Sequence, residues 1–207
     1  DVVLVGPDDE ALWSADVGLP APDWFPEVRP DDDGAAGRVC AAAIERAVSL
    51  AMDGHIDAVV TAPIHKPSLH AAGYDFPGHT EMLQELTGAP QVGMLMAAER
   101  TLLGGPLRVL LATTHVALAR VPQILTSELL VSQASLLCRA LQDDWGISAP
   151  RIALCAFNPH ASDEGLFGDE EARVYAPAIE RLRSSRGSLE ARALGSCCIR
   201  SWSTPTS

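Results

Sequence analysis

Short apolar segments alternate with helix-patterned segments along most of this chain, and this alternation limits the folds that it can adopt. Apolar residues recur at helical spacing over 38–52 and 127–145, and a third helical pattern at 169–183 is interrupted by Pro177. The segments with the apolar character of buried strands are 2–5, 56–61, 92–97, 108–112 and 151–157. Because such alternation is typical of βαβ units, we expect an α/β fold with a mostly parallel sheet and helices on both faces.

Shorter features complete the predicted organisation. Short helices are expected at 68–72 and 80–87, and Thr126 is expected to cap the helix that follows it. Residues 20–34, rich in Pro and Asp, predict an extended loop. We expect residues 1–183 to form one partial α/β domain. Residues 184–207 have no apolar period and predict an atypical tail, either disordered or artefactual.

Charge and hydropathy exclude several classes of partner. The formal net charge is -12 and only 15 Lys and Arg residues are spread along the chain, whereas nucleic-acid binding needs clustered cations. No apolar run approaches the roughly 20 residues of a membrane span, and the first residues do not resemble a signal peptide. The isolated Cys40, Cys138 and Cys155 suit buried thiols in a reducing compartment. We therefore expect a cytoplasmic protein without nucleic-acid or membrane partners.

Three histidines lie in short polar strings that follow apolar segments: His79, His115 and His160. In an open α/β sheet the ligand crevice lies beyond the carboxyl ends of the strands, so such residues can converge on one ligand. Neutral imidazole is also a common metal ligand. Taken singly, His115 and His160 are more often hydrogen-bonded structural residues, and their separation matches no metal-binding motif. Their shared position after a strand favours a common site.

The string around His79 has the features of an anion site. Gly78 permits close backbone approach, and a helix that begins near Thr80 leaves its first amides free for a phosphate. The alternative is that Thr80 is only an N-cap and His79 a surface residue. Lys66 offers a cation or is simply solvated. No Gly-x-Gly-x-x-Gly or Walker motif is present in the sequence, so a nucleotide would bind in another mode.

Four strings, in this order, resemble the 4-hydroxythreonine-4-phosphate dehydrogenase family of pyridoxal phosphate biosynthesis. They are TAPIHK (61–66), YDFPGHTE (74–81), LATTH (111–115) and NPHA (158–161), the last followed by Gly165 and GDEE (168–171). The likeness runs from about Asp1 to Arg183. It implies an isocitrate/isopropylmalate dehydrogenase-like α/β fold and a homodimer with its active site at the subunit interface. It also implies that His79 and Thr80 bind substrate and that His115 and His160 bind a divalent metal.

The chain departs from the family pattern at both ends. Family members have a further segment before the position of Asp1. After the position of Arg183 they have a Tyr-His-Asp-Gln string with a third metal histidine, and further substrate and nucleotide contacts. The printed sequence lacks these strings, so we expect an incomplete fold and an incomplete site.

The resemblance implies a specific reaction. NAD or NADP would oxidise 4-phosphohydroxy-L-threonine, a small phosphorylated substrate, and decarboxylation would give 3-amino-2-oxopropyl phosphate. Three histidine nitrogens favour zinc, with cobalt or magnesium left open. With two of the three ligands we expect weak metal binding and impaired activity. The alternatives are a related dehydrogenase of phosphorylated threonate, erythronate or a dihydrodiol, a metal-dependent hydrolase, and a noncatalytic remnant with exposed apolar faces.

Overall fold

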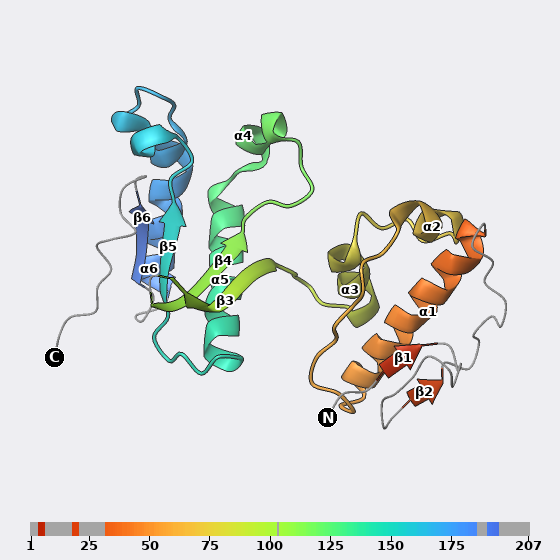
Figure 1. Cartoon of the computed structure of the whole chain (residues 1–207). Helices are drawn as coiled ribbons and strands as arrows, with labels where there is room; N and C mark the ends of the chain where they lie inside the picture. The colour runs from red at the N-terminus through yellow and green to blue at the C-terminus, as the bar shows by residue number, and fades with distance from the viewer. Residues whose placement is uncertain (1–3, 7–17, 21–31, 103, 186–189, 195–207) are drawn as a thin grey trace. The chain divides into compact units, whose positions relative to one another are not determined.

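The computed structural model describes residues 4–6, 18–20, 32–102, 104–185 and 190–194, and the chain divides into two compact units. The first unit is Asp1–Val92 and the second is Gly93–Ser207 (Figure 1). No composition shift in the sequence marks this boundary. Each unit is described by itself below.

Three helices make up most of what is described of the first unit: α1 (Asp33–Met52), α2 (Lys66–Ala71) and α3 (His79–Thr87). The first unit also contains a parallel pair of short strands, β1 (Leu4–Gly6) and β2 (Gly18–Pro20). The predicted strand at 2–5 therefore overlaps β1. Of the predicted loop at 20–34, residues 21–31 lie outside the described residues, and α1 begins within its last part.

Helix α1 starts five residues before the predicted start because it has a polar cap. The Asp32 carboxylate accepts a hydrogen bond from the Ala35 amide at 2.8 Å, which satisfies one donor of the first turn. Apolar spacing alone could not locate this start, since the first turn is small and polar. The buried face of α1 supplies Ala41, Ile44 and Val48 to a core that Leu69 and Met82 complete from α2 and α3.

The predicted strand at 56–61 is wrong, because residues 56–65 form no helix or strand. Val60 is 97% exposed, although its neighbours are as apolar as those of a buried strand. An apolar, β-branched segment becomes a strand only when a neighbouring strand pairs with it and side chains cover it. The described residues of the first unit provide no such neighbour.

The described residues of the second unit form two pairs of strands and a packed pair of helices, α5 and α6. Its elements in chain order are β3 (Met94–Thr101), β4 (Gly105–Leu111), η1 (Leu118–Arg120), α4 (Val121–Ile124), α5 (Ser127–Asp143), β5 (Arg151–Cys155), η2 (Pro159–Asp163), the π-helical turn Glu171–Tyr175, α6 (Ala176–Ser185) and β6 (Glu190–Leu194). The predicted strands at 92–97, 108–112 and 151–157 and the predicted helix at 127–145 are thus confirmed, with shifted ends.

The expected mostly parallel sheet is absent from the described residues. They form three separate two-stranded pairs, of which β3–β4 is antiparallel and β5–β6 is parallel, as β1–β2 is. Strands β3 and β4 are joined by a few residues, and a connection this short permits only an antiparallel hairpin. Apolar content identifies a strand but does not give its direction.

Part of the predicted tail at 184–207 has regular structure. Helix α6 continues to Ser185, and β6 pairs along its whole length with β5. The remaining residues, 186–189 and 195–207, lie outside the described part. The assignment of 184–207 as an atypical tail stays a prediction.

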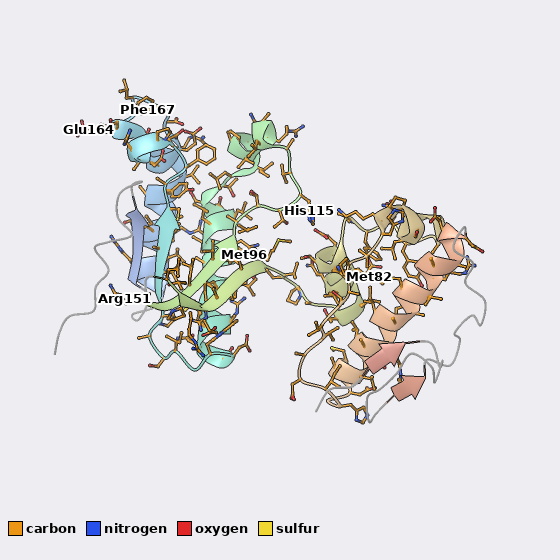
Figure 2. All side chains as sticks on the ribbon, in the orientation of Figure 1. Met82, Met96, His115, Arg151, Glu164 and Phe167 are labelled. Atoms are coloured by element: carbon orange, nitrogen blue, oxygen red, sulfur yellow. The ribbon has the colours of Figure 1, made fainter. Side chains whose placement is uncertain are left out.

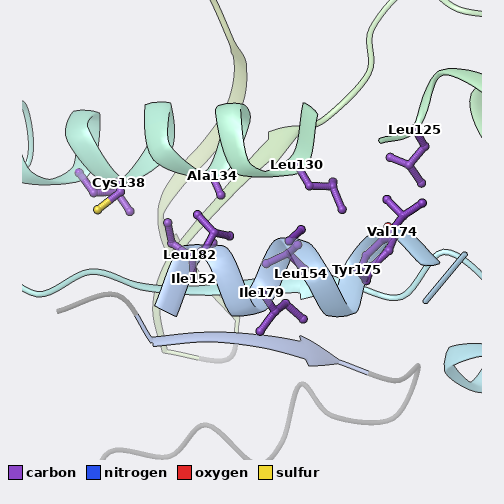
Figure 3. Packing of buried hydrophobic residues seen from close by; sticks show 12 residues of the cluster. Leu125, Leu130, Ala134, Cys138, Ile152, Leu154, Val174, Tyr175, Ile179 and Leu182 are labelled. Carbon is purple, nitrogen blue, oxygen red and sulfur yellow. The ribbon is translucent and has the colours of Figure 1, made fainter. Parts of the chain in front are cut away.

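The core of the second unit lies between α5, α6 and β5 (Figure 3). Its buried members are Leu125, Leu130, Ala134, Cys138, Leu141, Ile152, Leu154, Val174, Tyr175, Ala178, Ile179 and Leu182. The predicted cap is confirmed, since the Leu129 amide donates to the Thr126 hydroxyl at 3.1 Å. Pro177 lacks an amide proton, and a π turn directly before it leads into α6 without an ordinary helical bond at that position.

No single helix among the described residues is long and apolar enough to cross a membrane. The pair Leu118–Ile124 and Ser127–Asp143 meets the length and composition requirement only when joined across a bend of 96°. The apolar side of α5 is used for the core just described.

Candidate functional site

His79 and Thr80 are the first two residues of α3, and the helix is capped differently from the alternative raised by the sequence. The N-cap is the buried Gly78, in extended conformation with φ of -178°, and it provides no side-chain capping hydrogen bond. Thr80 is therefore not the N-cap. His79 Nε2 is buried and has no hydrogen-bond partner among the described residues.

A buried imidazole nitrogen without a hydrogen-bond partner is a candidate ligand-binding atom. A buried polar atom without a partner costs free energy that a hydrogen bond would recover. A bound phosphate or carboxylate could accept hydrogen bonds from the first-turn amides of α3, and the His79 ring could donate a hydrogen bond to the same anion. This local geometry is compatible with substrate binding by His79 and Thr80, which stays a prediction.

His115 follows β4 by three polar or small residues, as expected from the sequence. It is exposed, lies on the loop that leads to η1 and α4 (Figure 2), and has a left-handed backbone with φ of 56°. A left-handed conformation is uncommon for a residue other than glycine. The backbone at His115 is therefore held by its surroundings and not by its own preference.

His160 lies in a turn with an unusual backbone. The five residues from His160 to Glu164 all have positive φ, between 45° and 73°. The buried Ser162 hydroxyl donates to the Gly168 carbonyl oxygen, which closes the turn. The exposed His160 ring lies 6.3 Å from the Phe167 ring, centroid to centroid. Several left-handed residues in succession store strain, and such strain is concentrated at functional sites.

A carboxylate and an amide hold the base of this turn. The Glu171 carboxylate accepts hydrogen bonds from the backbone amides of Phe157 and Asn158, at 3.0 and 2.7 Å. The Asn158 side-chain amide donates to Glu170 at 2.8 Å and to Glu171 at 2.9 Å. Gly168 belongs to the same cluster, because a Cβ there would lie 2.4 Å from a Glu170 carboxylate oxygen. We call Asn158, Glu170 and Glu171 the turn clamp.

The turn clamp changes the acidity of Glu171. Burial by itself raises the pKa of this carboxyl, but hydrogen bonds from the Asn158 side chain and from the backbone amides of Asn158, Glu171 and Phe157 together outweigh burial. The pKa of Glu171 is therefore lowered. In the sequence Glu170 and Glu171 appear only within the GDEE string (168–171), which does not by itself predict the clamp.

The donors for a metal are incomplete within the part of the chain that the structure describes. Among the described residues, no group of three or more His, Cys, Asp or Glu side chains is placed to hold a metal ion. His115 and His160 lie on separate loops of the second unit. The His160 ring is beside Phe167, and Figure 2 labels His115 and Phe167. A shared metal at these two histidines stays a prediction, and the described residues do not form a complete site.

Helices and strands in alternation, with histidine-bearing loops after two of the strands, make this an α/β protein. Residues 26–194 match the model of the family described as pyridoxal phosphate biosynthetic protein PdxA, and the chain belongs to this family. The match extends past Arg183 and includes β6.

Curated relatives support the same assignment. The 4-hydroxythreonine-4-phosphate dehydrogenase of Caulobacter vibrioides is 45% identical over 141 residues, which are 68% of this chain and 42% of that protein. The enzyme of the same name from Desulfosudis oleivorans is 43% identical over 164 residues, 79% of this chain and 47% of that protein. The chain thus spans less than half the length of these relatives.

Solved structures agree at the level of the fold. A 4-hydroxythreonine-4-phosphate dehydrogenase from Klebsiella pneumoniae superposes with a TM-score of 0.73 and 33% identity, covering 91% of this chain and 57% of that one. A terephthalate 1,2-cis-dihydrodiol dehydrogenase from Burkholderia xenovorans has a TM-score of 0.60 at 23% identity, which shows a shared fold alone.

Proposed function

We propose that this chain takes part in the oxidation of 4-phosphohydroxy-L-threonine by NAD or NADP, with decarboxylation to 3-amino-2-oxopropyl phosphate. The observation that carries the proposal is the family match over residues 26–194, supported by relatives named for this substrate. Because the chain spans 42 to 47% of those relatives, we expect its activity alone to be impaired.

His79 and Thr80 are the proposed substrate residues. The buried Nε2 atom of His79 and the first-turn amides of α3 offer hydrogen bonds to the anionic groups of the substrate. In the proposed reaction the secondary alcohol loses a hydride from carbon and a proton from oxygen, and the resulting β-keto acid releases carbon dioxide. The nicotinamide cofactor, when bound, would accept the hydride.

His115 and His160 are the proposed metal donors of this chain. Because no third donor joins them within the described residues, we assign no step of the reaction to a metal. Imidazole donors favour zinc over magnesium by ligand softness, and cobalt and magnesium remain in the proposal. A homodimer and a cytoplasmic location also stay predictions.

Ligand binding by the purified chain tests this proposal. Isothermal titration with 4-phosphohydroxy-L-threonine should give saturable binding. His79→Ala should weaken this binding by roughly tenfold or more, the effect of losing hydrogen bonds to a charged group. His55→Ala, at an exposed turn of the same unit, should bind as the unsubstituted chain does. Binding that is absent, or equal in the His79→Ala variant, would refute the proposal.

Substrate choice is tested with the same protein. Phosphorylated threonate and erythronate retain the phosphate, whereas a cis-dihydrodiol lacks it. If the proposal holds, the dihydrodiol binds more weakly than each phosphorylated ligand. A preference for the dihydrodiol would transfer the chain to the related class of dehydrogenases.

A noncatalytic remnant is the second candidate, and exposed apolar side chains favour it. Val60 is 97% exposed and Met96 60% exposed. A remnant of this kind would bind none of these ligands. NAD reduction with 4-phosphohydroxy-L-threonine above the background of a protein-free sample would exclude it.

A further inference from the structure

A chain of hydrogen bonds in the first unit joins three side chains outside the residues discussed so far. His65 Nδ1 lies 2.8 Å from Ser68 Oγ, and the Ser68 hydroxyl donates to an Asp33 carboxylate oxygen at 3.0 Å. His65 is the N-cap residue of α2, and Asp33 is the first residue of α1. These hydrogen bonds therefore link the first turns of α1 and α2. The two bonded residues Ser68 and Asp33 are 35 positions apart in the sequence.

These two hydrogen bonds determine which ring nitrogen of His65 carries the proton. An ionised carboxylate only accepts hydrogen bonds, so the single hydroxyl proton of Ser68 is directed to Asp33. Ser68 Oγ then has only lone pairs to offer to His65, and Nδ1 must be the N–H donor. In the neutral imidazole this leaves Nε2 as an unprotonated acceptor.

Packing holds this arrangement in place. Ser68 is 6% exposed and the adjacent Leu69 is 1% exposed, so the start of α2 is anchored in the core of the first unit. Gly37 of α1 lies against Ser68, since a Cβ at Gly37 would be 1.9 Å from the Ser68 carbonyl oxygen. The two helices are thus in close backbone contact beside the hydrogen-bond chain. His65 itself is exposed, as is Lys66 next to it, so both are open to a ligand.

We propose that His65 is a ligand-binding residue whose Nε2 atom accepts a hydrogen bond from a hydroxyl group of a phosphorylated ligand, with Ser68 and Asp33 as its positioning residues. The exposed Lys66 ammonium adds a positive charge for the anionic part of the ligand. The proposal rests on the proposed function in that the ligand is the hydroxylated, phosphorylated substrate. It assigns to His65 the recognition of the hydroxyl group.

The first experiment measures the tautomer without any ligand. Long-range proton–nitrogen NMR of the full chain should show His65 protonated at Nδ1 when the ring is neutral. Ser68→Ala should remove this preference, whereas His70, an exposed residue of the same helix paired with Asp75 at 3.1 Å, should keep its own spectrum. A neutral His65 protonated at Nε2 in the unsubstituted chain would overturn the proposal.

The second experiment compares two ligands that differ in one hydroxyl group. The full chain should bind 4-phosphohydroxy-L-threonine roughly tenfold more tightly than O-phosphohomoserine, which lacks the secondary hydroxyl. In His65→Asn the side-chain amide can still donate to Ser68, but the outer acceptor is lost, so the difference should disappear. His65→Gln places an amide oxygen near the position of Nε2 and should retain part of the difference. His70→Asn is the matched control and should leave it unchanged.

The outcomes separate this inference from the proposed function. If both ligands bind, binding requires His79, and the affinity difference survives in His65→Asn, the role of His65 is refuted while the proposed function stands. If the unsubstituted chain binds neither ligand, both are refuted.

Discussion

Gly37 lies where the backbones of α1 and α2 are in close contact. In the sequence Gly37 lies just before the predicted helix at 38–52, so nothing marks it. In the structure it lies inside α1, where a glycine normally weakens the helix relative to alanine. The structure explains why this position is a glycine, because the Ser68 carbonyl oxygen occupies the place that a side chain would take. The residue type follows from a contact between two segments distant in sequence.

We expect Gly37→Ala to destabilise the chain although alanine is the better helix former. A Cβ 1.9 Å from a backbone oxygen forces the helices apart, and overpacking of this kind costs about 1–3 kcal/mol. Gly34→Ala is the matched control, because its new Cβ would meet its nearest atom at 3.4 Å and gain helix propensity. Urea unfolding followed by circular dichroism measures both. Equal stability of the two variants would contradict the packing argument.

Glu171 predicts a pH dependence of the turn that carries His160. Its pKa is lower in the folded chain than in the unfolded chain, so its stabilisation is fully present above the unfolded value of about 4.3. This stabilisation is lost as the pH falls through the lowered folded value. We therefore expect the amide NMR signals of Phe157 and Asn158 to change reversibly in the acid range below about pH 4.3.

A substitution checks the same assignment at constant pH. Glu171→Gln should shift the Phe157 and Asn158 amide signals at pH 6 in the direction that acid produces in the unsubstituted chain. Glu180→Gln, at an exposed position of α6, should leave them in place. If both variants have the spectrum of the unsubstituted chain, the turn clamp does not depend on the charge of Glu171.

At the level of helices and strands, local signals determined where elements begin when a capping side chain was present. The sequence predicts Thr126 as a cap because a polar residue precedes a strong apolar period, and the structure contains the expected hydrogen bond from the Leu129 amide. The Asp32 cap was missed, because the residues after it lack an apolar pattern. The segment 56–61 has strand composition but no pairing strand among the described residues, and composition cannot supply one.

The cap of α5 gives a prediction at this scale. Thr126→Ala should lower the free energy of unfolding of the second unit by about 1 kcal/mol, since the Leu129 amide loses its acceptor. Thr126→Ser keeps the hydroxyl oxygen and should recover most of the loss. Thermal unfolding of the three proteins checks this ranking. An alanine variant as stable as the serine variant would show that the cap contributes little.

For the chain as a whole, the separate strand pairs leave apolar surface uncovered. In the antiparallel pair β3–β4, Met96 is opposite Val109. Leu107 and Leu111 lie two positions before and after Val109 on β4, so their side chains point to the same face as that of Val109. These four side chains therefore share one face of the hairpin, and each is at least 38% exposed (Figure 2 labels Met96). Exposed apolar faces of this kind favour association.

We expect the purified chain to self-associate through this hairpin face at micromolar concentration. The double variant Met96→Lys, Val109→Glu places opposite charges on a cross-strand pair, so it should preserve the hairpin and reduce association. Leu118→Glu, at an 89% exposed position outside the hairpin, is the control. Sedimentation velocity over a concentration series measures the effect. A double variant that associates as strongly as the control would exclude this face.

The sequence by itself determined the α/β class, most helices and strands, the Thr126 cap and the family, because these depend on local periodicity, side-chain capping and short ordered strings. Only the tertiary structure decided the direction of β3 and β4, the exposure of 56–61, the turn clamp around Asn158 and Glu171, and the hydrogen-bond chain from His65 to Asp33. Each of these depends on a contact between atoms that the chain brings together from separate segments. Such contacts leave no periodic trace in either segment.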